Sequence, residues 1–240
     1  MANRFALGSG MLIAILGLGA CASGTTPSPP PSVASASPSQ SVTPTATASP
    51  SPTASPSTAA AAATLCAGGQ DDPSCNLTPG TYSADPFKPG FTFTITEPWT
   101  NDRRYADGGS ISMGDAAFLW ASGVSAGTVA DKEVTIGPGA AGFVAFLGQF
   151  KGFTVSAPAP AVVDGVTGIQ VDVETNATAA PGMFQIKNDV FNLDAGEKAR
   201  FVLLEKDGTT VIFIIDAFKA AGFDTFLTKA QPVFDSVTWE

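Results

Sequence analysis

Hydrophobic and polar side chains alternate most regularly in residues 91–96, where phenylalanine and isoleucine are separated by threonines. A period of two is typical of a β-strand that buries one face. Two further β-rich runs, residues 199–205 and 209–216, flank Gly208, which can adopt the positive φ of a tight turn, so they predict a β-hairpin. Weaker patterns predict short strands at residues 110–123, 128–136 and 183–186, on both sides of a turn at 164–165, and at 235–240.

Two segments follow a helical spacing instead. In residues 138–150, four apolar side chains recur at i, i+3, i+4 and i+7 and predict a helix with one apolar face: Phe143, Phe146, Leu147 and Phe150. The same kind of spacing recurs near the carboxyl end, at Phe223, Phe226, Leu227 and Ala230. Pro232 is expected to end this second helix. The order of the elements predicts an α+β fold, an antiparallel β-sheet with two main helices packed on it.

The amino-terminal segment precedes this fold and has a different character. An apolar run, residues 6–20, follows the single charge of Arg4 and is shorter than the ~20 residues of a membrane-spanning helix, so it predicts a secretory signal. Its end, "LGAC" at residues 18–21, resembles the lipobox of bacterial lipoproteins. The resemblance implies that the thiol of Cys21 receives a diacylglyceryl group, whose acyl chains include fatty acids such as palmitate, and that the chain is cleaved just before Cys21. The alternative is an ordinary signal peptide with an incidental Cys21.

The next segment, residues 22–64, contains no charged residue and is built almost entirely of Ser, Thr, Pro and Ala. Such a composition cannot bury a core, and it predicts a disordered, extended linker. It is also compatible with an O-glycosylated stalk. The sequence therefore divides into a signal peptide (1–20), a lipidated Cys21 with a disordered linker (21–64), and an α+β globular domain (65–240).

Composition narrows the function by exclusion. The chain of 240 residues has a net charge of −9 and no histidine. The missing histidine excludes Ser-His-Asp and Cys-His catalytic sets and histidine-ligated metal sites. The acidity argues against nucleic-acid partners, because phosphate binding needs clustered Lys and Arg. The negative charge is expected to keep the surface of the protein soluble. The alternative is a face that binds cations.

Cys66 and Cys75 lie close together in "CAGGQDDPSC". In an exported domain such a pair is expected to form a disulfide. The alternative use of this loop is a calcium site at Asp71 and Asp72, but two carboxylates fall short of the six to eight oxygens that calcium takes. No metal or cofactor is predicted.

A candidate interaction loop spans residues 97–105 and mixes charged and aromatic residues more densely than any other segment: Glu97, Trp99, Asp102, Arg103, Arg104 and Tyr105. Arg and aromatic residues are favoured at interaction hot spots, and Arg103 and Arg104 could bind a carboxylate or phosphate. The alternative is a solvated loop with a core tryptophan.

Three other segments are weaker candidates. Asp194 and Glu197 could act with another carboxylate on a sugar, as glycosidases do, or simply form a polar turn. Residues 137–142, "GPGAAG", lack the Lys and Ser/Thr of a phosphate loop. Asn76 and Asn176 lie in glycosylation sequons that a bacterial lipoprotein would not normally use.

Over roughly residues 87–240, an early strand ending in "EPW", a central helix, a late hairpin and a terminal helix running into "FDSVTWE" resemble the PsbP-like fold group. Members of that group mostly act as binding or assembly modules. We therefore expect a non-enzymatic binding or interaction module on the extracytoplasmic face of the cell membrane, held there by its lipid anchor. Its expected partner is an envelope protein or a small ligand, and the sequence carries no signal for an oligomeric state. The alternatives are a carboxylate-based hydrolase of a sugar polymer and a small-ligand-binding lipoprotein.

Overall fold

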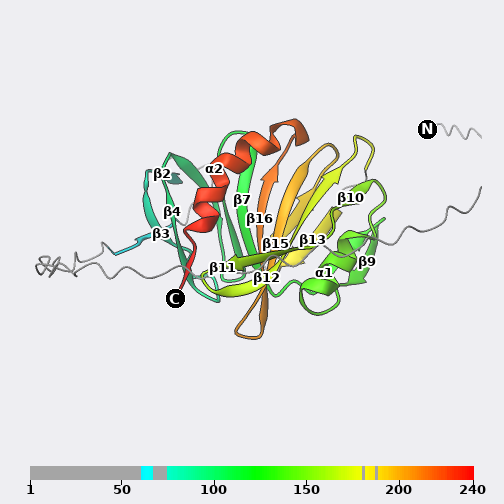
Figure 1. The fold of residues 1–240 in the computed structure, drawn as a ribbon, viewed down its shortest axis with the longest axis horizontal. Helices are drawn as coiled ribbons and strands as arrows, with labels where there is room; N and C mark the ends of the chain where they lie inside the picture. Colours follow the sequence, from blue (N-terminus) through cyan, green and yellow to red (C-terminus); the bar gives the residue numbers. More distant parts are fainter. Residues whose placement is uncertain (1–60, 67–74, 180–181, 187–188) are drawn as a thin grey trace, which may run out of the picture. The chain divides into compact units, whose positions relative to one another are not determined.

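The structure is a computed structural model that describes residues 61–66, 75–179, 182–186 and 189–240 (Figure 1). Cys21, the predicted signal peptide and most of the predicted linker lie outside the described residues, as do Asp71 and Asp72. The linker's last two residues, Ala63–Thr64, form strand β1 and pair with Tyr82 and Ser83. No helix in the described part of the chain is long and apolar enough to cross a membrane.

A large antiparallel sheet, here called the central sheet, runs through the described domain. Its spatial order is β10 (Phe153–Val155), β12 (Val166–Thr175), β15 (Lys198–Lys206), β16 (Thr209–Ala217), β7 (Ala116–Ser122), β6 (Gly108–Ser112), β5 (Trp99–Arg104) and β2 (Asn76–Leu77). β11 (Ala159–Val163) also pairs with β12. The predicted hairpin is β15–β16, and its turn residues Asp207 and Gly208 both have positive φ.

Two smaller sheets accompany the central sheet. The first, here the β4 sheet, has the order β1, β3 (Gly80–Ser83), β4 (Phe91–Ile95) and β17 (Thr238–Trp239). The second, here the β13 sheet, has the order β14 (Asp189–Leu193), β13 (Gly182–Ile186), β8 (Ala126–Val129) and β9 (Lys132–Thr135). The predicted disulfide between Cys66, after β1, and Cys75, before β2, is present. It links the β4 sheet to the edge of the central sheet.

The helices are α1 (Gly139–Leu147) and α2 (Phe223–Asp235), and a short 3-10 turn, Ala220–Gly222, leads into α2. Both lie where the apolar spacing predicted. The predicted stop at Pro232 is wrong, because α2 continues through it to Asp235. Pro232 lies in the last turn, so its missing N–H removes one backbone hydrogen bond while the buried Val233 and Phe234 still anchor the helix end.

Apolar side chains cover both faces of the central sheet. Val211, Phe213 and Ile215 of β16 belong to one hydrophobic cluster, shared with the β4 sheet and α2. Ile212 and Ile214 point the opposite way into a second cluster, shared with the β13 sheet and α1. β16 therefore reads as a continuous apolar run, because each of its faces is buried.

The predicted α+β class is wrong. The described chain is mostly β, with three sheets and α-helices of only 9 and 13 residues. The main cause is that several strands lack the alternation of polar and apolar residues, because their segments are either mostly polar or apolar throughout. The sequence predicts a loop over residues 97–105, but residues 99–104 form β5, and residues 189–193 form β14, for which the sequence carries no strand pattern.

Candidate functional site

The predicted interaction loop does not exist as a loop, because most of it is strand β5. Trp99 is buried in the core against Phe226, with 5.6 Å between ring centroids. Glu97 lies 2.9 Å from the ammonium of Lys229. Both residues therefore contact α2, Trp99 in the core and Glu97 through an ion pair, and neither lines the cleft described below.

The other four residues of the predicted loop lie in different surroundings. The guanidinium of Arg104 binds the carboxylate of Asp85 at 3.2 Å, and Tyr105 lies at the surface. Asp102 and Arg103 instead line a cleft on the face of the central sheet that carries the β13 sheet. Only this pair of the six predicted residues contributes to the candidate site.

A β-bulge aims Asp102 and Arg103 into that cleft. The register between β5 and β6 shifts between Asn101 and Arg103, so β5 carries an extra residue there. The fully buried Asn101 stabilises the bulge by donating from Nδ2 to the carbonyls of Arg103 and Ser110, at 3.1 and 3.0 Å. Asp102 accepts a hydrogen bond of 2.8 Å from the hydroxyl of Ser112.

The cleft has a volume of about 410 Å³ and lies between the central sheet and β14. We call it the acidic cleft, because four carboxyl groups line it: Asp102, Asp194, Glu197 and Asp216. Its remaining walls are Arg103, Ser110, Ala117, Leu119, Val190, Phe191, Asn192 and Phe218. Arg103 is the one basic residue among these described lining residues.

Asp216 forms the buried wall of the acidic cleft. It lies on β16 opposite two small residues, Ala117 of β7 and Ala199 of β15. The side chain is 2% exposed, and its Oδ1 has no hydrogen-bond partner among the described residues. Burial, reinforced by the charges of Glu197 and Asp194, raises the pKa of Asp216 well above its usual range.

Glu197 lies next to Asp216, just before β15. Since Ala199 is directly opposite Asp216, Glu197 occupies a diagonal cross-strand position, where backbones are about 7–8 Å apart. Its Oε2 accepts a hydrogen bond of 2.7 Å from the backbone N–H of Asp194. Burial raises the pKa of Glu197, against the lowering effect of that hydrogen bond. Burial likewise raises the pKa of Asp102, although Ser112 and Arg103 act in the opposite direction.

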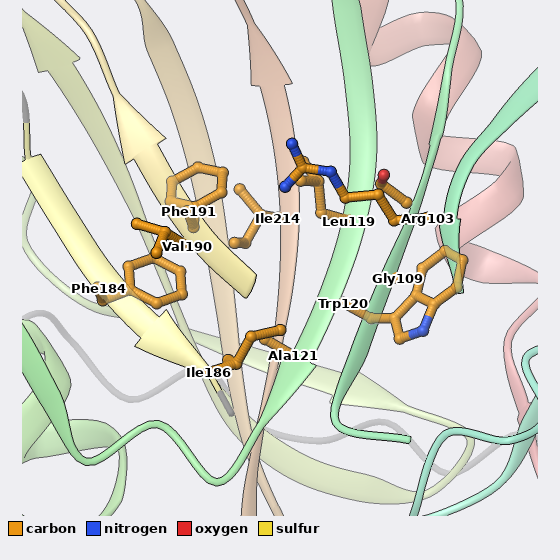
Figure 2. Close-up of a pocket in the computed structure, with 11 residues that line it drawn as sticks. Arg103, Gly109, Leu119, Trp120, Ala121, Phe184, Ile186, Val190, Phe191 and Ile214 are labelled. Carbon is orange, nitrogen blue, oxygen red and sulfur yellow. The ribbon is translucent and has the colours of Figure 1, made fainter. Parts of the chain in front are cut away.

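A smaller apolar pocket of about 30 Å³ adjoins the acidic cleft and shares part of its wall, including Arg103, Leu119, Val190 and Phe191. Figure 2 shows side chains of β13 and β14 facing those of β7 and β16 across this pocket. Two of the four exposed large hydrophobic residues in the described chain, Val190 (39%) and Phe218 (45%), also line the acidic cleft. The site thus has an acidic wall beside an exposed apolar rim.

Of the weaker sequence candidates, Asp194 and Glu197 both line this site, together with Asp216, which belongs to no motif in the sequence. The signal available in the sequence was a single acid at the end of the apolar run "VIFIIDA". The glycine-rich segment has a packing role, because a Cβ on Gly142 would clash with the backbone carbonyl of Gly137. Within the described residues, no group of three or more acidic or cysteine side chains is arranged to hold a metal ion.

The fold and the site define a layered β protein with an acidic cleft between two of its sheets. No protein-family model matches the chain, and no curated protein matches its sequence. Among solved structures, it is similar to a protein from Bacteroides thetaiotaomicron, at 8% identity and a TM-score of 0.33, over 62% of this chain and 45% of that one. The chain thus spans less than half of that protein.

A second solved structure is LpqN, involved in cell envelope biogenesis of Mycobacterium tuberculosis. The identity is 12% and the TM-score 0.29, over 68% of this chain and 88% of that one. Likenesses at this level do not assign a function. The lipobox and the PsbP-like resemblance therefore stay predictions from the sequence.

Proposed function

We propose that the domain is a non-enzymatic binding module that holds a small ligand in the acidic cleft, at the extracytoplasmic face of a membrane to which Cys21 tethers it. The observation that carries this proposal is Asp216, which lines a cleft of about 410 Å³ and whose buried Oδ1 has no hydrogen-bond partner among the described residues. A buried polar atom without a hydrogen-bond partner is unfavourable, so a ligand that supplies the hydrogen bond gains binding free energy.

The surroundings of Asp216 support a binding role. Ligand sites are typically concave, largely apolar, and equipped with a few polar groups that fix orientation. The acidic cleft combines Leu119, Phe191 and the exposed Phe218 with its carboxyl groups. Its volume lies within the range of about 300–1,000 Å³ found for small-molecule pockets.

We expect a screen of small polar and amphipathic compounds to perturb the NMR signals of residues around the acidic cleft, measured on the isotope-labelled protein. Phe218→Ala should weaken the response, because it removes an exposed apolar wall without disturbing the core. Thr81→Ala, on the exposed Thr81–Thr94 hydroxyl contact, is a matched surface control. Compounds that perturb only residues remote from the cleft, or none at all, would contradict the proposal.

A carboxylate-based hydrolase acting on a sugar polymer is a second candidate, favoured by the meeting of Asp194, Glu197 and Asp216 in one cleft. Such an enzyme needs one carboxyl group as an acid and another as an ionised base or nucleophile, both facing the substrate. Glu197 already uses one oxygen to cap the turn at Asp194. Release of reducing ends from envelope glycans, abolished by both Asp216→Asn and Glu197→Gln, would favour this candidate over the binding module.

The membrane tether is a separate prediction. We expect Cys21→Ser to move the protein from the membrane fraction to the soluble fraction or the medium, because attached acyl chains, rather than a spanning helix, would hold it. Immunoblotting of fractionated cells measures the shift. Ser23→Ala, two residues further along, is the control and should stay with the membrane. Unchanged retention of Cys21→Ser would contradict the lipid anchor.

A further inference from the structure

We propose that the ligand of the acidic cleft is an organic ammonium ion with a short apolar arm. Its charged group is held by Asp216 and Glu197, and its arm lies along Phe191 and Phe218. This inference rests on the proposed function and names the chemical class that the same cleft selects.

The charge of the cleft selects a cation. Four carboxyl groups reach it from separate segments of the chain: Asp102 from β5, Asp194 after β14, Glu197 before β15 and Asp216 from β16. Arg103, the one basic residue among the described lining residues, is itself engaged in an interaction. At neutral pH the carboxyl groups outnumber the basic group, so the potential in the cleft favours a positive ligand.

Asp216 supplies the point of attachment. Burial and the charges of Glu197 and Asp194 all disfavour its ionised form, and nothing among the described residues donates to its Oδ1. An ammonium group carries three N–H donors and a positive charge. It would therefore donate a hydrogen bond to the carboxyl group of Asp216 and also stabilise its ionised form. The residues opposite Asp216 are the small Ala117 and Ala199, and Ala117 lines the cleft beside Asp216.

The aromatic and aliphatic walls favour an organic cation over a metal ion. Within the described residues, no group of acidic or cysteine side chains is arranged for a metal. Phe191 and Phe218 line the cleft beside the carboxyl groups, and aromatic faces attract ammonium ions by cation–π interaction. Phe191 is also held in place by Phe184, with ring centroids 4.7 Å apart, so this wall is preformed.

The neighbouring apolar pocket limits the length of the arm. It is walled by Phe184, Ile186 and Ile214 and continues from the cleft past Phe191. Figure 2 shows these side chains around Ala121 and Leu119. Its volume of about 30 Å³ is close to that of a single water molecule, so it takes only the tip of an arm. The rest of the arm lies against the exposed rim at Val190 and Phe218.

Binding depends on pH in a defined direction. The charged and titratable groups facing Asp216 among the described residues are Asp102 and Arg103, from β5, and Asp194 and Glu197, near β14 and β15. Only the ionised carboxylate of Asp216 attracts an ammonium ion, and burial raises its pKa. The affinity should therefore rise with pH from the acid to the neutral range, and binding should release protons.

The test is calorimetric and NMR titration of the purified protein with hexylammonium, hexan-1-ol and hexanoate at constant ionic strength. We expect saturable binding of hexylammonium, with perturbed signals confined to the cleft, and no such binding of the other two. Asp216→Asn should weaken it by about tenfold or more, the loss expected for a buried charge-assisted contact. Glu197→Gln tests the second carboxyl group. Asp115→Asn, an equal charge change outside the cleft, should leave the affinity unchanged.

The outcomes separate the inference from the proposed function. If hexan-1-ol or a simple sugar binds in the cleft while hexylammonium does not, or if hexylammonium binds better in acid than at neutral pH, the ammonium inference is wrong and the binding module survives. If neither these compounds nor the wider screen perturbs the cleft, both are wrong. Equal binding to Asp115→Asn and Asp216→Asn would also overturn the ammonium site.

Discussion

Replacing Phe213 by alanine is expected to destabilise the domain by about 3–5 kcal/mol, the usual cost of removing a buried phenylalanine. Phe213 is fully buried on β16. Its ring lies 5.2 Å from that of Phe91, 5.8 Å from those of Phe234 and Trp239, and 5.9 Å from Phe118, measured between centroids. Alanine would leave a cavity where the central sheet, the β4 sheet and α2 meet, and these elements cannot all close over it.

Urea denaturation and thermal unfolding both measure this effect. For a chain of this size, about 1 kcal/mol corresponds to roughly 2–4 °C in Tm. Phe218→Ala is the matched control, because the same atoms are removed from a side chain that is 45% exposed. A loss for Phe213→Ala no larger than that for Phe218→Ala would show that the shared cluster is not the centre of the core.

Asp216→Asn is expected to stabilise the protein at neutral pH, so its Tm should be higher than that of the wild type. Burial raises the pKa of Asp216 well above its ordinary value of 3.8, so the folded state binds a proton more tightly than the unfolded state does. Stability is then greatest below that ordinary value and declines as the pH rises towards the folded-state pKa. Asparagine keeps the shape of the side chain and removes this decline.

The difference between the two proteins should accordingly vanish near pH 3.8 and grow as the pH rises, as followed by Tm in a series of buffers. Asp115→Asn is the control. The hydrogen bond and charge of Lys219 lower the pKa of this exposed carboxyl group, so the substitution should lower the Tm slightly at neutral pH and not raise it. A constant difference between wild type and Asp216→Asn at every pH would mean that titration of Asp216 does not contribute.

Local patterns predicted the elements that have one buried face or a strong turn. The alternation in residues 91–96, the turn at Gly208 and the helical spacing around Phe143 all correspond to elements of the structure. The class was wrong because neighbouring segments follow no simple period. β7 and β16 are covered on both faces, and β5 combines a buried Trp99 and Asn101 with polar residues that have partners elsewhere.

The site was predictable only in part, for a related reason. Asp194 and Glu197 are close in sequence and could be considered together, whereas Asp216 joins them through the register of β15 against β16. Similarly, nothing in "TNDRRY" indicates a bulge that turns Asp102 and Arg103 into the cleft while Arg104 turns to Asp85. Cross-strand register and bulges depend on tertiary pairing, which local composition does not specify.

The pairing of β17 with β4 has a consequence for how the protein is made. Thr238 and Trp239 complete the β4 sheet, and Trp239 donates from Nε1 to the carbonyl of Val163 and from its backbone N–H to Asp164. During synthesis, β4 therefore leaves the ribosome long before the strand that closes its edge. Such pairing between residues far apart in the sequence slows folding, so the β4 sheet should be among the last parts of the domain to form.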